Sequence, residues 1–100
     1  MRIALDAMGG DHAPDINLEG AVAALSHRQD LEILLVGPSE LIENKLTQYS
    51  YDHARMHIVH APQVISNDEA PVMAIRKKRD SSIVVGAKLV RDGEADAFIS

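Results

Sequence analysis

The sequence predicts an α/β fold in which a mainly parallel sheet is covered by helices on both faces. Short aliphatic runs alternate with longer segments whose apolar residues recur at helical spacing. One of these runs is apolar on both faces, which is typical of a central parallel strand. No internal repeat or low-complexity linker interrupts the alternation. This order of elements is typical of a three-layer α/β/α fold with right-handed crossovers.

The first part of the chain predicts a strand, a helix and a second strand. The first strand is expected over residues 2–6, and the helix begins at Pro14 and ends in the polar segment 26–30. Its apolar stripe consists of Leu18, Ala21, Val22 and Leu25. Residues 31–36 are expected to form the central strand, in which only Glu32 is polar.

The middle of the chain predicts a second helix and a third strand. Pro38 suits a first helical turn, and Glu40 there complements the helix dipole. The expected buried stripe consists of Leu41, Ile42, Leu46 and Tyr49. Residues 56–60 are expected to form the third strand, which Pro62 limits, and its histidines at 57 and 60 would face opposite sides.

The last third of the chain predicts two helices and a fourth strand. The polar segment 66–69 precedes a short helix from Pro71 to Lys78. The next helix begins at Ser81-Ser82 and stops at Asp92-Gly93, where Gly93 takes the usual post-helix position. Its expected buried residues are Ile83, Val84, Ala87 and Val90. A strand is expected over residues 95–100, and because a parallel strand normally leads into a covering helix, we expect a longer parent chain.

Composition favours one globular domain with a cytoplasmic location. Of the 100 residues, 46% are hydrophobic, which is enough for a core of ordinary size. The chain has no cysteine, so disulfides and thiolate chemistry are excluded. The formal charge of −5 argues against nucleic acid as a partner. No apolar run approaches the roughly 18 residues that a membrane span needs.

The loop after the first strand is the first candidate site, because ligands in α/β sheets bind at the carboxyl ends of strands. Gly9 and Gly10 would let the backbone turn sharply or approach a ligand. Asp6 and Asp11 could orient a cation, a hydroxyl or a basic side chain. The alternative is a tight turn in which Asp11 accepts hydrogen bonds from loop or helix N–H groups. The loop lacks the pattern G-x-G-x-x-G, so no dinucleotide cofactor is expected.

The basic segment 76–79 and the two serines at 81 and 82 form the second candidate site. Helix N–H groups, the positive end of the helix dipole and an arginine fork would act together on an anion such as phosphate. The alternative is a solvated basic turn in which Asp80 or Ser81 caps the helix. The histidines at 53, 57 and 60 do not form a convincing ligand set, so no metal is expected.

Residues 3–14, Ile-Ala-Leu-Asp-Ala-Met-Gly-Gly-Asp-His-Ala-Pro, closely resemble the start of the PlsX family of bacterial phosphate acyltransferases. Further matches follow in the same order at residues 35–37, 70–71, 74–76, 79–82, 95–97 and 99–100. The resemblance runs through the whole chain. Family members are several-fold longer, and Ser100 would open their Ser-Ala-Gly-Asn-Thr-Gly loop. The 100 residues are therefore expected to be the N-terminal part of one larger acyltransferase domain.

The resemblance implies that the whole protein transfers a fatty acyl group from acyl carrier protein to inorganic phosphate. The product would be an acyl phosphate for phospholipid synthesis, formed without a cofactor. It also implies a cytoplasmic homodimer with a Rossmann-like fold similar to isopropylmalate dehydrogenases. Peripheral membrane association in the family is attributed to a later region. The 100 residues alone are expected to be inactive, and the alternative is a non-catalytic α/β phosphate-binding or interaction module.

If a phosphate oxygen attacks the thioester carbonyl directly, without a covalent nucleophile from the protein, both candidate sites have roles in the transfer. The expected phosphate ligands are Arg76, Arg79, Ser81 and Ser82, with Ser100 opening the glycine-rich loop. Asp6, Gly9, Gly10 and Asp11 would form the facing wall. The candidate catalytic residues are Asp6, Asp11 and Arg76. Lys77 and Lys78 are expected to face solvent or the acidic carrier protein.

Overall fold

The computed structural model describes residues 1–64 and 70–100, so the polar segment expected at 66–69 lies outside the described residues. The elements follow in the order β1 (Arg2–Asp6), α1 (Asp15–His27), β2 (Glu32–Gly37), α2 (Ser39–Leu46), β3 (Met56–His60), α3 (Pro71–Lys77), α4 (Ser82–Arg91) and β4 (Ala97–Ile99). Every expected helix and strand is present, and most bounds differ from the expected ones by one or two residues.

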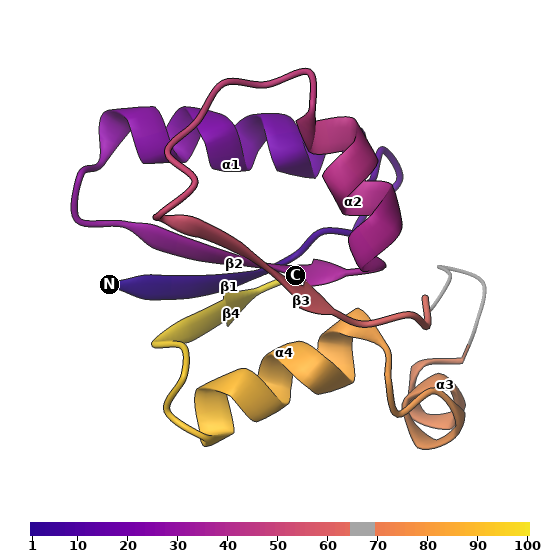
Figure 1. Ribbon diagram of the computed structural model, residues 1–100. Coiled ribbons are helices and arrows are strands. Elements are labelled where there is room, and N and C mark those ends of the chain that lie inside the picture. The colour runs from indigo at the N-terminus through magenta and orange to yellow at the C-terminus, as the bar shows by residue number, and fades with distance from the viewer. Residues whose placement is uncertain (65–69) are drawn as a thin grey trace.

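The four strands form one parallel sheet in the order β3-β2-β1-β4. Helices α1 and α2 cover one face and α4 covers the other (Figure 1). From β1 the chain adds β2 and then β3 on one side of β1, and it then crosses back to add β4 on the other side of β1. Crossovers of one hand place their helices on opposite faces when the direction of travel reverses. The expected α/β fold with a parallel sheet is therefore confirmed.

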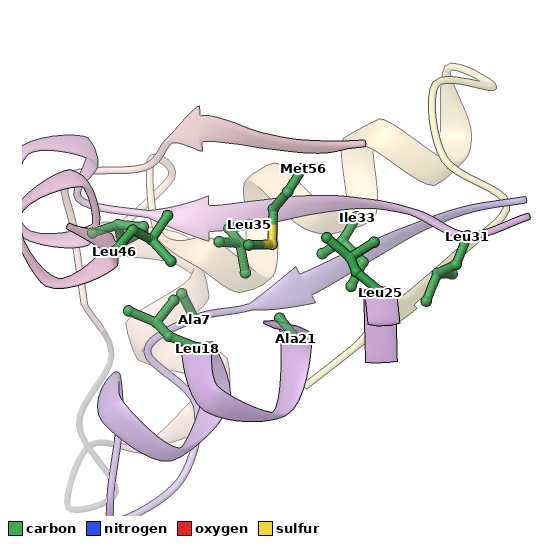
Figure 2. Close-up of a cluster of buried hydrophobic side chains, with 10 residues drawn as sticks. Ala7, Leu18, Ala21, Leu25, Leu31, Ile33, Leu35, Leu46 and Met56 are labelled. Carbon is green, nitrogen blue, oxygen red and sulfur yellow. The ribbon is translucent and has the colours of Figure 1, made fainter. Parts of the chain in front are cut away.

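The larger core lies between the sheet and the pair α1 and α2 (Figure 2). Leu18 and Leu25 of α1 are fully buried there, as are Leu35 of β2 and Ile42 of α2. Full burial of one such side chain contributes about 1.5–3 kcal/mol. A smaller core under α4 contains Ala4, Leu34, Val36 and Leu89, so β2 is covered on both faces as expected.

The expected buried stripe of α4 is wrong. The residues that α4 buries are Ser82, Gly86 and Leu89, whereas Ala87 and Val90 are exposed. The reason is Phe98 of β4, whose ring lies directly against Gly86, so that a methyl group on this glycine would collide with it. The missing side chain lets the helix approach the sheet along this line.

Smaller differences concern α2 and β4. Ile42 and Leu46 are buried as expected, but Leu41 is exposed. Pro38 precedes the helix rather than occupying its first position. Tyr49 follows the helix and packs half-buried against the larger core. The fourth strand covers three residues instead of six.

Hydropathy and helix length give one further result. Among the residues that the structure describes, no helix is long and apolar enough to cross a membrane.

Candidate functional site

The carboxyl ends of β1 and β4 lie where the strand order reverses. The chain leaves β1 in one direction, and it later comes back to pair β4 with the other side of β1. In open α/β sheets, ligands bind in the crevice at such a reversal. Helix α4 begins at the same edge of the sheet, because Ser81 pairs with Gln63, just beyond the carboxyl end of β3. Both candidate sites therefore lie at one edge.

Asp6 joins the ends of β1 and β4. Its carboxylate accepts the Met8 N–H at Oδ1, at 3.0 Å, and the Ser100 hydroxyl at Oδ2, at 3.2 Å. The residue is only 5% exposed, and no ion pair of Asp6 occurs within the described residues. A buried carboxylate with two neutral donors retains capacity for further hydrogen bonds. It could therefore accept a bond from a guanidinium or a substrate hydroxyl.

Gly9 and Gly10, in the glycine loop of residues 6–10, are explained by different features of the structure. A methyl group on Gly9 would lie 3.1 Å from Oδ2 of Asp6, so the loop backbone packs closely on that carboxylate. Gly10 has a φ of 89°, a conformation that favours glycine. Gly10 is also exposed, and a methyl group there would meet no atom within 4 Å. The expected sharp turn is present and the backbone packs closely on Asp6, whereas the expected close approach to a ligand stays a prediction.

Asn17 is a site residue that the sequence did not reveal. Its side-chain amide nitrogen lies 3.2, 3.0 and 2.8 Å from the carbonyl oxygens of Asp6, Ala7 and Gly9. Three acceptors identify this end of the side chain as the NH₂ group. The available signal was a polar residue next to Leu18, in the first turn of a helix that follows a glycine loop. Asn17 thereby fixes the loop to α1.

Asp11 lies in the exposed turn between β1 and α1. The N-cap position of α1 is occupied by Pro14, whose side chain makes no hydrogen bond to the helix. The peptide bond between Ala13 and Pro14 is cis. The structure thus places Asp11 at the outer side of the loop, apart from the buried carboxylate of Asp6.

At the second candidate site, Ser81 caps α4. Its hydroxyl oxygen accepts the Val84 N–H at 3.5 Å, and the side chain is buried. The alternative in which Ser81 caps the helix is therefore confirmed for that residue. The cap does not exclude an anion site, because the N–H groups of Ser82 and Ile83 have no hydrogen-bond partner among the described residues.

The hydroxyl of Ser82 is the most unusual polar group at this edge. Ser82 is the first residue of α4, is 4% exposed, and its Oγ has no hydrogen-bond partner in the described part of the chain. A buried hydroxyl without a partner costs about 1–3 kcal/mol. It lies where free N–H groups and the positive end of the dipole favour an anion. A bound phosphate oxygen would satisfy it.

The basic segment leads into this helix. Arg76 and Arg79 are exposed, and neither forms an ion pair within residues 1–64 and 70–100. Lys77 is exposed as expected, but Lys78 is half-buried and its Nζ donates to the Val64 carbonyl at 2.8 Å. Lys78 is thus only partly exposed, because its ammonium group holds the chain that follows β3, and its contact with a carrier protein stays a prediction.

Gln63 anchors the end of the basic segment. Its backbone N–H donates to the Asp80 carbonyl at 3.3 Å, and its side-chain oxygen accepts the Asp80 N–H at 2.9 Å. The structure thus brings together Asp6, Gly9 and Ser100 in one group, and Ser81 and Ser82 in another. No hydrogen bond or ion pair joins the arginines to the glycine loop among the described residues.

The histidines lie elsewhere. His57 Nε2 is 2.7 Å from Oε1 of Glu32, and Arg2 Nε is 3.3 Å from the other carboxylate oxygen, Oε2. The hydrogen bond from His57 is the main cause that lowers the pKa of Glu32, and Arg2 adds to it. His60 Nδ1 accepts the Ser39 N–H at 3.1 Å. Within the described ranges, no three potential metal ligands gather at one point.

Comparison with known proteins gives a consistent result. All 100 residues match a family model described as "Fatty acid synthesis protein". Over the whole chain, the phosphate acyltransferases of Alkaliphilus oremlandii, Thermoanaerobacter pseudethanolicus and Syntrophomonas wolfei are 50%, 49% and 48% identical to it. The chain spans 30%, 29% and 31% of the lengths of these relatives.

Proposed function

The chain belongs to the family of fatty acid synthesis proteins, as its resemblance predicted, and we propose that it supplies part of the active site of a phosphate acyltransferase. The reaction transfers a fatty acyl group from acyl carrier protein to inorganic phosphate. The product is an acyl phosphate, which serves phospholipid synthesis. The name of the relatives supports phosphate as the acceptor, and the description of the family supports a fatty acyl donor.

The observation that carries this proposal is the buried hydroxyl of Ser82 at the start of α4, which lacks a hydrogen-bond partner in the part of the chain that the structure describes. In the proposed complex, this hydroxyl and the free N–H groups of the first helical turn donate to phosphate oxygens. Arg76 and Arg79 add charge, since a guanidinium can hold two phosphate oxygens at once. Their exposure leaves both side chains able to reach an anion at this edge.

The proposed chemistry is direct transfer. A phosphate oxygen attacks the thioester carbonyl carbon, and the π electrons of the carbonyl move onto its oxygen. When the tetrahedral intermediate collapses, the C–S bond breaks and the thiolate leaves, to be protonated by solvent. The protein then contributes position and charge stabilisation instead of a covalent nucleophile.

Asp6 is assigned a positioning role in this scheme. Its carboxylate holds the Ser100 hydroxyl and the Met8 N–H, so it links the glycine loop to the end of β4. Asp11 lies further out, where it could orient an arginine.

We further propose that the whole protein is a cytoplasmic homodimer.

A second function is favoured by one observation. The basic segment and the glycine loop share an edge but no hydrogen bond or ion pair among the described residues, and the chain spans about a third of the relatives' length. These 100 residues alone could therefore bind phosphate without turning over an acyl thioester.

The two functions are separated by measuring acyl phosphate formation from acyl carrier protein thioester and phosphate. The isolated chain is compared with a chimera in which its 100 residues replace the matching region of the Alkaliphilus oremlandii enzyme. Activity in the chimera alone supports the acyltransferase proposal. An inactive chimera that unfolds cooperatively, beside an active parent enzyme, contradicts it and favours the binding module.

A further inference from the structure

The peptide groups of the glycine loop, residues 6–10, have fixed directions. The Asn17 amide holds the carbonyls of Asp6, Ala7 and Gly9, the shortest contact being that to Gly9 at 2.8 Å. In a trans peptide, the C=O and N–H of one unit point in opposite directions. The N–H groups of residues 7, 8 and 10 therefore point away from Asn17.

Two of these three N–H groups already have partners. The Ala7 N–H donates to the Val36 carbonyl at 3.0 Å, and the Met8 N–H donates to the Asp6 carboxylate at 3.0 Å. The Gly10 N–H has no hydrogen-bond partner within the described residues. Of these three N–H groups, whose directions Asn17 fixes, it is the one that can still donate a hydrogen bond to a ligand.

The space beside Gly10 is open. This residue is exposed, and a methyl group on it would meet no atom within 4 Å. Its φ of 89° results from the turn of the loop and not from a lack of room. A substrate can therefore approach Gly10 at the edge of the sheet where Asp6 meets Ser100.

We propose that the Gly10 N–H is a hydrogen-bond donor to the thioester carbonyl oxygen and that Asn17 is the positioning residue that aims it. This inference rests on the proposed acyl transfer. When phosphate attacks the carbonyl carbon, the electron pair of the C=O π bond moves to the carbonyl oxygen, which becomes an oxyanion. The pair returns as the C–S bond breaks and the thiolate leaves. A donor fixed in advance stabilises this charge without reorganising.

The test replaces Asn17 in the chimera with the Alkaliphilus oremlandii enzyme. Asn17→Asp keeps the size of the side chain but places carboxylate oxygens against three carbonyls. Loss of one such donor lowers kcat by about 10²–10³-fold. We expect a loss of this size in kcat while the KM for phosphate changes less than about twofold, because the proposed phosphate ligands lie at the start of α4 and in the basic segment before it. The matched control is Asn44→Asp on the exposed side of α2, with unchanged kcat.

A folded Asn17→Asp variant with the kcat of the parent chimera overturns the proposal, and so does a loss confined to the KM for phosphate. A second measurement requires no variant and no activity. Amide hydrogen exchange in the 100-residue chain should be fast at Gly10 and slower at Ala7, whose N–H is bonded to β2. Protection of the Gly10 amide comparable to that of Ala7 overturns the proposed donor. An inactive parent chimera instead contradicts the acyl transfer itself, whatever the exchange pattern.

Discussion

Replacing Gly86 by alanine tests the packing of α4 on the sheet. In an isolated helix this change favours folding, because alanine is better than glycine by about 1 kcal/mol in a helix interior. In this chain, the added methyl group would collide with the ring of Phe98, which must move. Overpacking of this kind costs about 1–3 kcal/mol. We therefore expect Gly86→Ala to lower the free energy of unfolding by up to about 2 kcal/mol.

Gly20→Ala is the matched control. Gly20 lies in the interior of α1, and a methyl group there would meet no atom within 4 Å. The change should raise the free energy of unfolding by about 0.5–1 kcal/mol. The two glycine-to-alanine variants thus have opposite expected signs, although their intrinsic helix preferences are the same.

Urea unfolding of the 100-residue chain, followed by far-ultraviolet circular dichroism, measures both variants. A lower unfolding midpoint for Gly86→Ala and a higher one for Gly20→Ala agree with the structure. A Gly86→Ala variant that is at least as stable as the parent, with an unchanged denaturant slope, would refute the close contact with Phe98. The penalty should also shrink in a Phe98→Leu background, because the two residues are in contact.

Three further predictions concern stability. Leu35→Ala should lower the free energy of unfolding by about 2–5 kcal/mol, because Leu35 is fully buried in the larger core. The lowered pKa of Glu32, caused first by His57 and then by Arg2, makes its carboxylate stabilise the fold above the ordinary pKa of 4.5. That stability is lost as the pH falls through the lowered pKa, so Glu32→Gln should weaken the pH dependence of unfolding in this acidic range. Ser82→Ala should leave stability unchanged or raise it in phosphate-free buffer, because it removes a buried hydroxyl that has no partner within residues 1–64 and 70–100. It should also weaken any stabilisation by added phosphate.

Each of these predictions has a control on the surface. Leu41→Ala should change stability by less than about 0.5 kcal/mol, because this leucine is exposed. Asn44→Gln, which removes no titratable group, should retain the pH dependence of the parent, and Ser50→Ala should retain the response to phosphate. A Leu41→Ala cost equal to that of Leu35→Ala, a Glu32→Gln profile identical to the parent, or a Ser82→Ala variant that responds fully to phosphate would contradict the respective assignments.

Much of the fold follows from local patterns in the sequence. The bounds of β1 and β3 agree with those expected, because short aliphatic runs between polar segments leave few alternatives. The central position of β2 follows from its apolar residues on both faces. The buried side of α4 could not be predicted in the same way. Nearly all its positions between 83 and 90 are apolar or small, and the choice depends on Phe98, which lies on another element.

The candidate site shows the same division. Asp6, Gly9 and Gly10 stand out in the sequence by residue type, and the structure accounts for each of them through a contact or a backbone angle. Asn17 does not stand out, because its partners are backbone carbonyls that leave no trace in the pattern of side chains. The half-buried position of Lys78 depends likewise on a carbonyl, that of Val64.

The central claim is that phosphate binds at the start of α4, and the most direct measurement is the KM for phosphate in acyl phosphate formation by the chimera. Arg76→Ala and Ser82→Ala should each raise this KM, the arginine change by about tenfold or more, since hydrogen bonds to charged groups contribute about 1.5–3 kcal/mol. The KM for the acyl thioester should change little. An unchanged KM for phosphate in both variants, with full folding and activity, would contradict the assignment of this site.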